Sequence, residues 1–143
     1  MRGVKHNAHE ELTLLDLVLL LHGEFRRGLE PIRVTPLQAG VLLFLRRHTE
    51  AKVTDAAAAL GVGPPTLSEV VTDLVRKRWV TKRRSATDTR VVHLLLSRRG
   101  QVITRKIENQ VRRVSTGVAA NKGLTAAGLT RLHRIPVQLK EGR

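Results

Sequence analysis

Apolar residues recur mostly at helical spacing along this chain, and the polar interruptions predict several helices and one short hairpin. From Glu10 to about Arg27, leucine and valine are so frequent that they cover nearly every face of a helix. A helix that is apolar all round must be buried on more than one side. We therefore expect the second side of this helix to face a partner subunit.

The clearest helix start in the sequence follows Val34. Thr35 can cap the helix, Pro36 suits its first position, and Gln38 completes a Thr-x-x-Gln capping box. Apolar residues then line one face until the polar stretch after Leu45. This pattern predicts a second helix with one buried face.

Two further helices are separated by a turn that contains glycine. We expect Thr54 to cap the first, and Gly61 to end it. The second is predicted over about 66–77, with apolar residues at i, i+3, i+4, i+7 and i+8. These apolar residues are Leu67, Val70, Val71, Leu74 and Val75. A short helix, a turn and a helix with a polar outer face are typical of a helix-turn-helix.

Two β-rich stretches, 79–84 and 90–97, flank the polar segment 85–89 and predict a two-stranded hairpin. The five-residue tip has no glycine, so we expect a longer, mobile loop rather than a tight turn. A helix-turn-helix followed by a hairpin is a winged helix, so the predicted fold class is mainly α with a small β-hairpin wing.

Two helices are expected after the hairpin. Ser97 is placed to cap a long helix with apolar residues at helical spacing as far as Val118, and the segment 121–123 ends it. A last helix is predicted from about Leu124 and is disturbed by Pro136.

Charge narrows the choice of partner. The 143 residues include 26 Lys and Arg against 12 Asp and Glu, a formal net charge of +14, which indicates nucleic acid or an anionic membrane surface. Apolar residues make up 41%, too many for a disordered basic tail. Between Arg76 and Lys106, Asp88 is the single acid among many basic side chains, the pattern expected for binding to a phosphate backbone.

Several classes of protein are disfavoured by what the sequence lacks. It has no cysteine, which excludes disulfides, thiol redox sensing, cysteine zinc sites and cysteine nucleophiles. Phe25, Phe44 and Trp79 are too few aromatics to stack single-stranded bases. The apolar run near the N-terminus is far shorter than a membrane span of about 20 residues, and Glu10 and Glu11 precede it. We expect a cytoplasmic protein without a membrane partner.

The sequence gives little indication of a catalytic site or of a metal site. His6 and His9, with the two acids after them, could ligate a metal, but a solvated lead-in is favoured. His22 and His93 are interpreted as packing histidines. The sequence contains no catalytic constellation and no Gly-rich phosphate loop. We expect no enzyme activity, no cofactor and no metal.

Four segments match one family of regulators in order and spacing. They are VTPLQAGVLLFL, TDAAAALGVGPPTLSEVVTDLVRKRWV, the Asp-x-Arg at Asp88-Thr89-Arg90, and LLLSRRG in place of Leu-Thr-x-x-Gly. Together they cover about 35–100, and the chain resembles the MarR (multiple antibiotic resistance regulator) family of bacterial transcription factors. The resemblance implies a single domain over 1–143, with a winged-helix core at about 35–100 and dimerisation helices at about 8–30 and 101–140.

The resemblance also implies a homodimer on a pseudo-palindromic operator of double-stranded DNA. The polar face of the 66–76 helix would enter the major groove, and Arg90 would reach a narrow minor groove, which attracts an inserted arginine. The side chains expected to contact DNA are Pro65, Thr66, Ser68, Glu69, Thr72, Arg76, Lys82, Arg83, Arg84, Asp88 and Arg90. A small-molecule effector, of unknown identity, would enter a crevice lined partly by the first helix and Phe44.

Two residues depart from the family pattern. Arg78 stands where the family usually has glycine, and a left-handed backbone there would cost roughly 1–2 kcal/mol. Relatives often carry arginine within the second helix of the helix-turn-helix, whereas this helix carries the acids Glu69 and Asp73. Glu69 can complete a capping box with Thr66 or can accept a hydrogen bond from a cytosine amino group, and capping is the favoured interpretation.

Asp88 looks out of place in a basic hairpin. A solvent-exposed tip residue is the simplest interpretation, but its two-residue spacing from Arg90 would let the carboxylate brace the guanidinium or the loop amides. We expect a sequence-specific transcriptional regulator, a repressor, with Asp88 organising the wing. The alternative is an architectural DNA-binding protein of low specificity.

Overall fold

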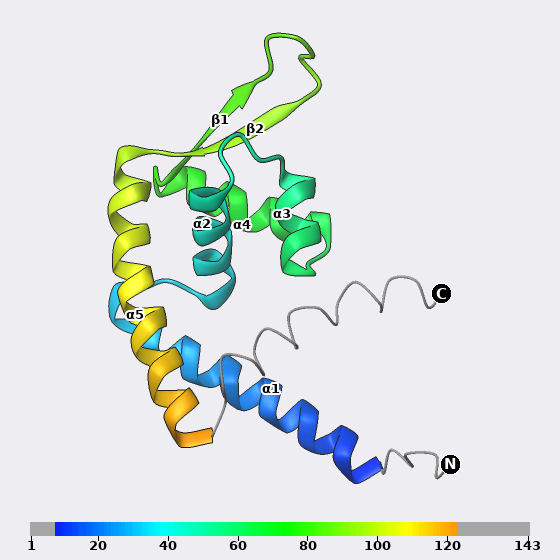
Figure 1. Cartoon of the computed structure of the whole chain (residues 1–143). Coiled ribbons are helices and arrows are strands. Elements are labelled where there is room, and N and C mark those ends of the chain that lie inside the picture. Colours follow the sequence, from blue (N-terminus) through cyan, green and yellow to red (C-terminus); the bar gives the residue numbers. More distant parts are fainter. Residues whose placement is uncertain (1–7, 123–143) are drawn as a thin grey trace.

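The computed structural model describes residues 8–122, and the side chains of residues 14–120 (Figure 1). The elements in chain order are α1 (Ala8–Leu29), the 3-10 helix η1 (Glu30–Ile32), α2 (Pro36–Arg47), α3 (Val53–Leu60), α4 (Pro64–Arg76), β1 (Val80–Arg84), β2 (Val92–Leu96) and α5 (Arg98–Lys122). The predicted fold class, mainly α with one hairpin wing, is confirmed. The helix expected from Leu124 lies outside the described residues, and the proposed domain limits stay a prediction.

Two parts of the molecule are distinct in Figure 1. Helices α2, α3 and α4 cluster beneath the hairpin, and we call this region, residues 36–96, the winged-helix lobe. Helices α1 and α5 pack on each other and extend from the end of the lobe that lies opposite the hairpin. We call this pair of helices the helical arm. Because α5 also contacts α2 and β2, it joins the arm to the lobe.

The core lies where all these elements meet. Leu42 of α2, Leu67 and Leu74 of α4, Leu94 of β2 and Ile107 of α5 are fully buried. Burying such a side chain stabilises the fold by about 1.5–3 kcal/mol. The apolar stripe predicted for the second helix of the helix-turn-helix therefore faces the core, as the sequence indicated.

The predicted capping box of α2 is present. The Gln38 amide donates to Thr35 Oγ1 at 3.2 Å, and the Thr35 amide donates to Gln38 Oε1 at 3.1 Å. Pro36 occupies the first turn. The box fixes where α2 begins and so sets which of its residues face the core.

Thr54 does not cap α3, so that prediction is wrong. Lys52 is the N-cap, so the helix begins two residues earlier than a Thr54 cap would place it, at Val53. The Asp55 carboxylate, three residues after the N-cap, accepts the backbone amide of Lys52 at 3.0 Å, which is one half of a capping box. Gly61 ends α3 with φ 66°, as predicted.

Arg78, just after the end of α4, adopts the costly left-handed backbone rather than a different end of the helix. Its φ is 60°, and the Trp79 and Arg78 amides donate to the carbonyls of Leu74 (3.0 Å) and Val75 (2.9 Å). These two bonds form a Schellman motif, which usually has glycine at the left-handed position. An arginine there is strained by about 1 kcal/mol.

The hairpin and α5 meet at a close backbone contact. Ser97 caps α5 as predicted, since its hydroxyl oxygen accepts the Gly100 amide at 2.9 Å, and the hydroxyl donates to the Arg78 carbonyl at 2.6 Å. A Cβ on Gly100 would lie 1.9 Å from the Trp79 carbonyl oxygen. Only glycine fits here, because the obstructing atom belongs to the backbone.

Candidate nucleic-acid interface

Helix α4 starts earlier than its sequence pattern predicted. Gly63 is the N-cap, and Pro64 and Pro65 occupy the first turn. Prolines suit these positions because their fixed φ is helical and the first amides of a helix have no partner inside it. Thr66 is thus already inside the helix, and the capping box that we favoured for Thr66 and Glu69 is not formed.

The outer face of α4 is exposed as predicted. Its exposed side chains are Pro65, Thr66, Ser68, Glu69, Thr72 and Arg76. The Thr72 hydroxyl donates to the Ser68 carbonyl at 2.9 Å, and Arg76 pairs with Asp73 at 3.0 Å. This face therefore presents hydroxyls and one paired arginine rather than a cluster of free cations.

The wing is an antiparallel hairpin in which Val80 pairs with Leu96 and Arg84 with Val92. Val80 is buried beneath it, whereas Lys82, Arg83 and Arg84 are all exposed on β1. Because side chains alternate along a strand, Lys82 and Arg84 lie on one face of the hairpin and Arg83 on the other, and none of them enters the core.

The tip of the wing, residues 85–91, is ordered by its acid. The Asp88 carboxylate accepts the backbone amide of Arg90 at 3.0 Å and the Nε of its side chain at 3.3 Å. The expected brace is thus present, but its physical basis is a turn in which Asp bonds the amide two residues on, not the alternation of a strand. Arg90 remains 90% exposed, so the brace directs the guanidinium without covering it.

Glu50, in the loop between α2 and α3, is a second acid that contacts the wing, and the sequence interpretation missed it. Its carboxylate pairs with the Arg83 guanidinium, and Glu50 has φ 60°. The Leu94 amide donates to the Ala51 carbonyl at 2.8 Å, which brings the loop before α3 against β2. No local pattern predicts this pair, because 33 residues separate its members.

The predicted DNA-binding residues on α4 and those on the wing form two sets of side chains that do not bond to each other. Among residues 8–122, no hydrogen bond or ion pair joins an α4 residue of the predicted site to a wing residue of that site. Arg84 instead donates to the Thr89 carbonyl at 2.8 Å, within the wing. Each group is thus held by its own element, and the shared core fixes their relative position.

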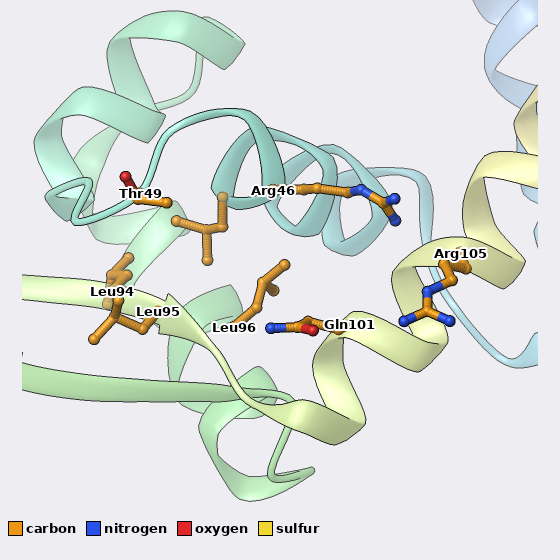
Figure 2. A pocket seen from close by; sticks show the side chains of 8 residues that line it. Arg46, Thr49, Leu94, Leu95, Leu96, Gln101 and Arg105 are labelled. Carbon is orange, nitrogen blue, oxygen red and sulfur yellow. The ribbon is translucent and has the colours of Figure 1, made fainter.

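A hollow of about 280 Å³ lies between α2, β2 and α5. Figure 2 shows Leu94, Leu95 and Leu96 entering it from β2, and Gln101 and Arg105 from α5. Arg46 also lines it, and this arginine pairs with Glu108 of α5 at 3.2 Å. The hollow combines apolar walls with two guanidinium groups, at the point where the lobe joins the arm.

This hollow differs from the predicted crevice in its lining. Neither α1 nor Phe44 contributes to it, since Phe44 packs against the core and stacks with the His48 ring at 4.5 Å. A second hollow, between α1 and α5, is lined by Leu20, Leu21 and Val114 among others.

The helical arm leaves an apolar face uncovered. The exposed large side chains of α1 are Leu14, Leu15, Val18, Leu19 and Leu20, each more than half exposed. Near its C-terminal end α1 packs on α5 so closely that a Cβ on Gly28 would lie 2.3 Å from a Val114 methyl carbon. The prediction that this helix has two apolar sides is consistent with this arrangement.

Neither a membrane-spanning helix nor a metal-ligand cluster is present among the residues that the structure describes. Within residues 8–122, no helix combines the length and hydropathy of a membrane span. In the same range, no three His, Asp or Glu side chains are grouped as metal ligands would be. His6 and the side chain of His9 lie outside what the structure describes.

Comparison with known proteins relates the chain to one family. A MarR family model matches residues 34–91. The repressor MdtR of Bacillus subtilis (strain 168) is 28% identical over 92 residues, which cover 64% of this chain and 59% of that repressor. The family model thus covers most of the winged-helix lobe, and the match to MdtR spans less than two thirds of the length of that repressor.

Two solved structures share the fold. The repressor CouR bound to a 23-mer DNA duplex has a TM-score of 0.78 at 22% identity, covering 93% of this chain and 100% of that one. BpsR of Bordetella bronchiseptica also has a TM-score of 0.78, at 15% identity, covering 100% of this chain and 99% of its own. The neighbours are winged-helix proteins, in agreement with the predicted fold class.

Proposed function

We propose that the chain is a member of the MarR family, whose model matches residues 34–91, and that it is a cytoplasmic transcriptional regulator that represses genes by binding double-stranded DNA as a homodimer. The observation that carries the proposal is the pairing of an exposed polar face on α4 with an exposed basic wing over one core. CouR, which has the same fold, is a repressor seen on a DNA duplex.

Helix α4 is the proposed reader of the operator. A second helix of a helix-turn-helix lies in the major groove with its N-terminal residues at the base edges. Pro65, Thr66, Ser68, Glu69 and Thr72 occupy that part of α4 and are exposed. Arg76, one turn further on, is positioned for the phosphate backbone.

The wing supplies most of the affinity. Lys82, Arg83 and Arg84 are exposed on β1, and each phosphate that they neutralise releases counterions. Arg90, directed by Asp88, would reach the adjacent minor groove. Affinity should therefore fall steeply as salt rises.

A second copy of the chain is the proposed cover for the apolar face of α1. Five large side chains there are between 54% and 60% exposed, so covering the exposed part of each would contribute roughly half of the about 1.5–3 kcal/mol expected for burying a fully exposed side chain. Two copies related by a twofold axis present two α4 helices and two wings, which fits a pseudo-palindromic operator.

The hollow between α2, β2 and α5 is the proposed effector site. Its apolar walls and the guanidinium group of Arg105 suit a compact organic anion, while Arg46, which also lines the hollow, is paired with Glu108. The DNA binding of BpsR is regulated by 6-hydroxynicotinic acid, a small aromatic acid. A titration with benzoate, followed by the fluorescence of the single tryptophan, Trp79, should saturate in the native chain and weaken in Arg105→Ala.

An architectural DNA-binding protein is the second candidate. Glu69 and Asp73 on α4 and the net charge of +14 favour it, because affinity would then come from backbone charge alone. Selection of bound fragments from random DNA separates the two functions. A regulator enriches a palindrome, whereas an architectural protein enriches no sequence.

A further inference from the structure

Glu69 has no structural task in the described part of the chain. Because Gly63 is the N-cap of α4, Glu69 does not complete a capping box, and no ion pair or hydrogen bond holds the Glu69 carboxylate among residues 8–122. The neighbouring acid, Asp73, is paired with Arg76 at 3.0 Å. Glu69 is thus an exposed and unpaired carboxylate on α4.

Glu69 also lies at the centre of the exposed stripe of α4. Pro65 precedes it by four residues and Thr72 follows by three, so the three side chains share one face. Leu67 and Val71 are buried on the opposite face. A groove that receives this stripe would therefore receive the Glu69 carboxylate.

A carboxylate is a costly group to bring to DNA. It repels phosphates, and it loses hydration in the groove unless it finds a donor there. The major-groove edges offer two kinds of amino donor, N4 of cytosine and N6 of adenine, while guanine and thymine offer acceptors. At adenine the neighbouring N7 is an acceptor and opposes a second carboxylate oxygen, so cytosine fits better.

We propose that Glu69 determines specificity by accepting a hydrogen bond from the N4 amino group of a cytosine in each operator half-site. The inference rests on the proposed function, in which α4 enters the major groove. It explains why an acid occupies the reading face of a chain whose other DNA-facing charges are mostly positive.

The test is a selection of bound DNA with the full chain and two variants, Glu69→Gln and Asp73→Asn. Each variant removes one negative charge from α4, and both are nearly isosteric. The native chain should enrich cytosine at one position of each half-site and bind about tenfold or more weakly when that base is changed. Glu69→Gln should shift the preference to adenine, because glutamine pairs with N6 and N7. Asp73→Asn should keep cytosine.

Two outcomes would overturn the inference in distinguishable ways. A motif that is the same for the native chain and for Glu69→Gln means that Glu69 contributes only repulsion, while the proposed function stands. No enriched motif with the native chain would overturn sequence-specific regulation itself, and the role of Glu69 with it.

Discussion

The winged-helix lobe and the helical arm treat apolar side chains in opposite ways. In the lobe, Leu42, Leu67, Leu74 and Leu94 are fully buried and the surface carries charge. In the arm, α1 leaves Leu19 and four similar side chains more than half exposed. The apolar side chains of the lobe are thus buried in a core that Leu29 of α1 and Ile107 of α5 complete, whereas α1 packs against α5 on one side and leaves other apolar side chains uncovered.

This difference in the burial of apolar side chains predicts different roles for the surface charges of the lobe and the exposed apolar side chains of the arm. Charged residues on the lobe can be exchanged with little effect on folding, because surface ion pairs contribute about 0–1 kcal/mol. Apolar residues on the arm should contribute to assembly, because their burial requires a second chain. Variants in the two regions should therefore fail in different assays.

The largest effect is expected from Leu19→Glu on the arm. A charge in the centre of the apolar face would be desolvated without a partner, so the dimer should dissociate and operator affinity should fall about 100-fold or more. Light scattering after size exclusion measures the mass, and a gel shift measures the affinity. Arg47→Gln, which lowers the charge by the same amount on the lobe, should remain dimeric. A dimer that survives Leu19→Glu would mean that this face is not the interface.

Gly100→Ala should destabilise the contact between the winged-helix lobe and the helical arm. The new Cβ would lie 1.9 Å from the Trp79 carbonyl oxygen, so the backbone must move, and we expect a loss of about 3 kcal/mol in the free energy of unfolding. Urea denaturation measures it. Gly117→Ala is the matched control, since its Cβ meets nothing within 4 Å and alanine favours a helix. Equal stability of the two variants would refute the tight contact.

Arg90→Ala should weaken operator binding several-fold or more without changing the melting temperature. Its guanidinium is 90% exposed and contributes nothing to the core. Asp88→Ala should weaken binding less, because the cation remains but loses its direction. Gel shifts and thermal melts check both, with Arg112→Ala on the arm as a control for charge. If Asp88→Ala left DNA affinity and the order of the wing unchanged, Asp88 would be an ordinary tip residue.

The smallest effect is expected from Arg78→Gly. Glycine adopts φ 60° without strain, so the free energy of unfolding should rise by up to about 1 kcal/mol. Thermal melting measures the change. A destabilised Arg78→Gly variant would show that the arginine side chain stabilises the turn more than its backbone strains it.

Local patterns in the sequence predicted local structure well. The capping box at Thr35, the stripe through Leu67 and Leu74, the Ser97 cap and the Asp88 brace each depend on residues within one or two turns of each other. Their physics is short-range, so a single sequence contains what is needed.

The misses have physical reasons as well. The start of α4 was misplaced because two prolines can occupy a first turn as readily as a threonine can cap one. Glu50 and Arg83 meet only because a loop pairs with β2, and no local pattern encodes that contact. The pairing of Asp73 with Arg76, by contrast, follows from helical spacing, and it could have been predicted.

The central claim is that the lobe reads a DNA sequence while the arm pairs two lobes. The most direct test is the ratio of two affinities of the full chain, for its selected palindrome and for random duplex of equal length, at one salt concentration. We predict a ratio of about 10³ or more, as a regulator requires. A ratio near one would contradict the account, since it would mean that the basic wing holds DNA without regard to sequence.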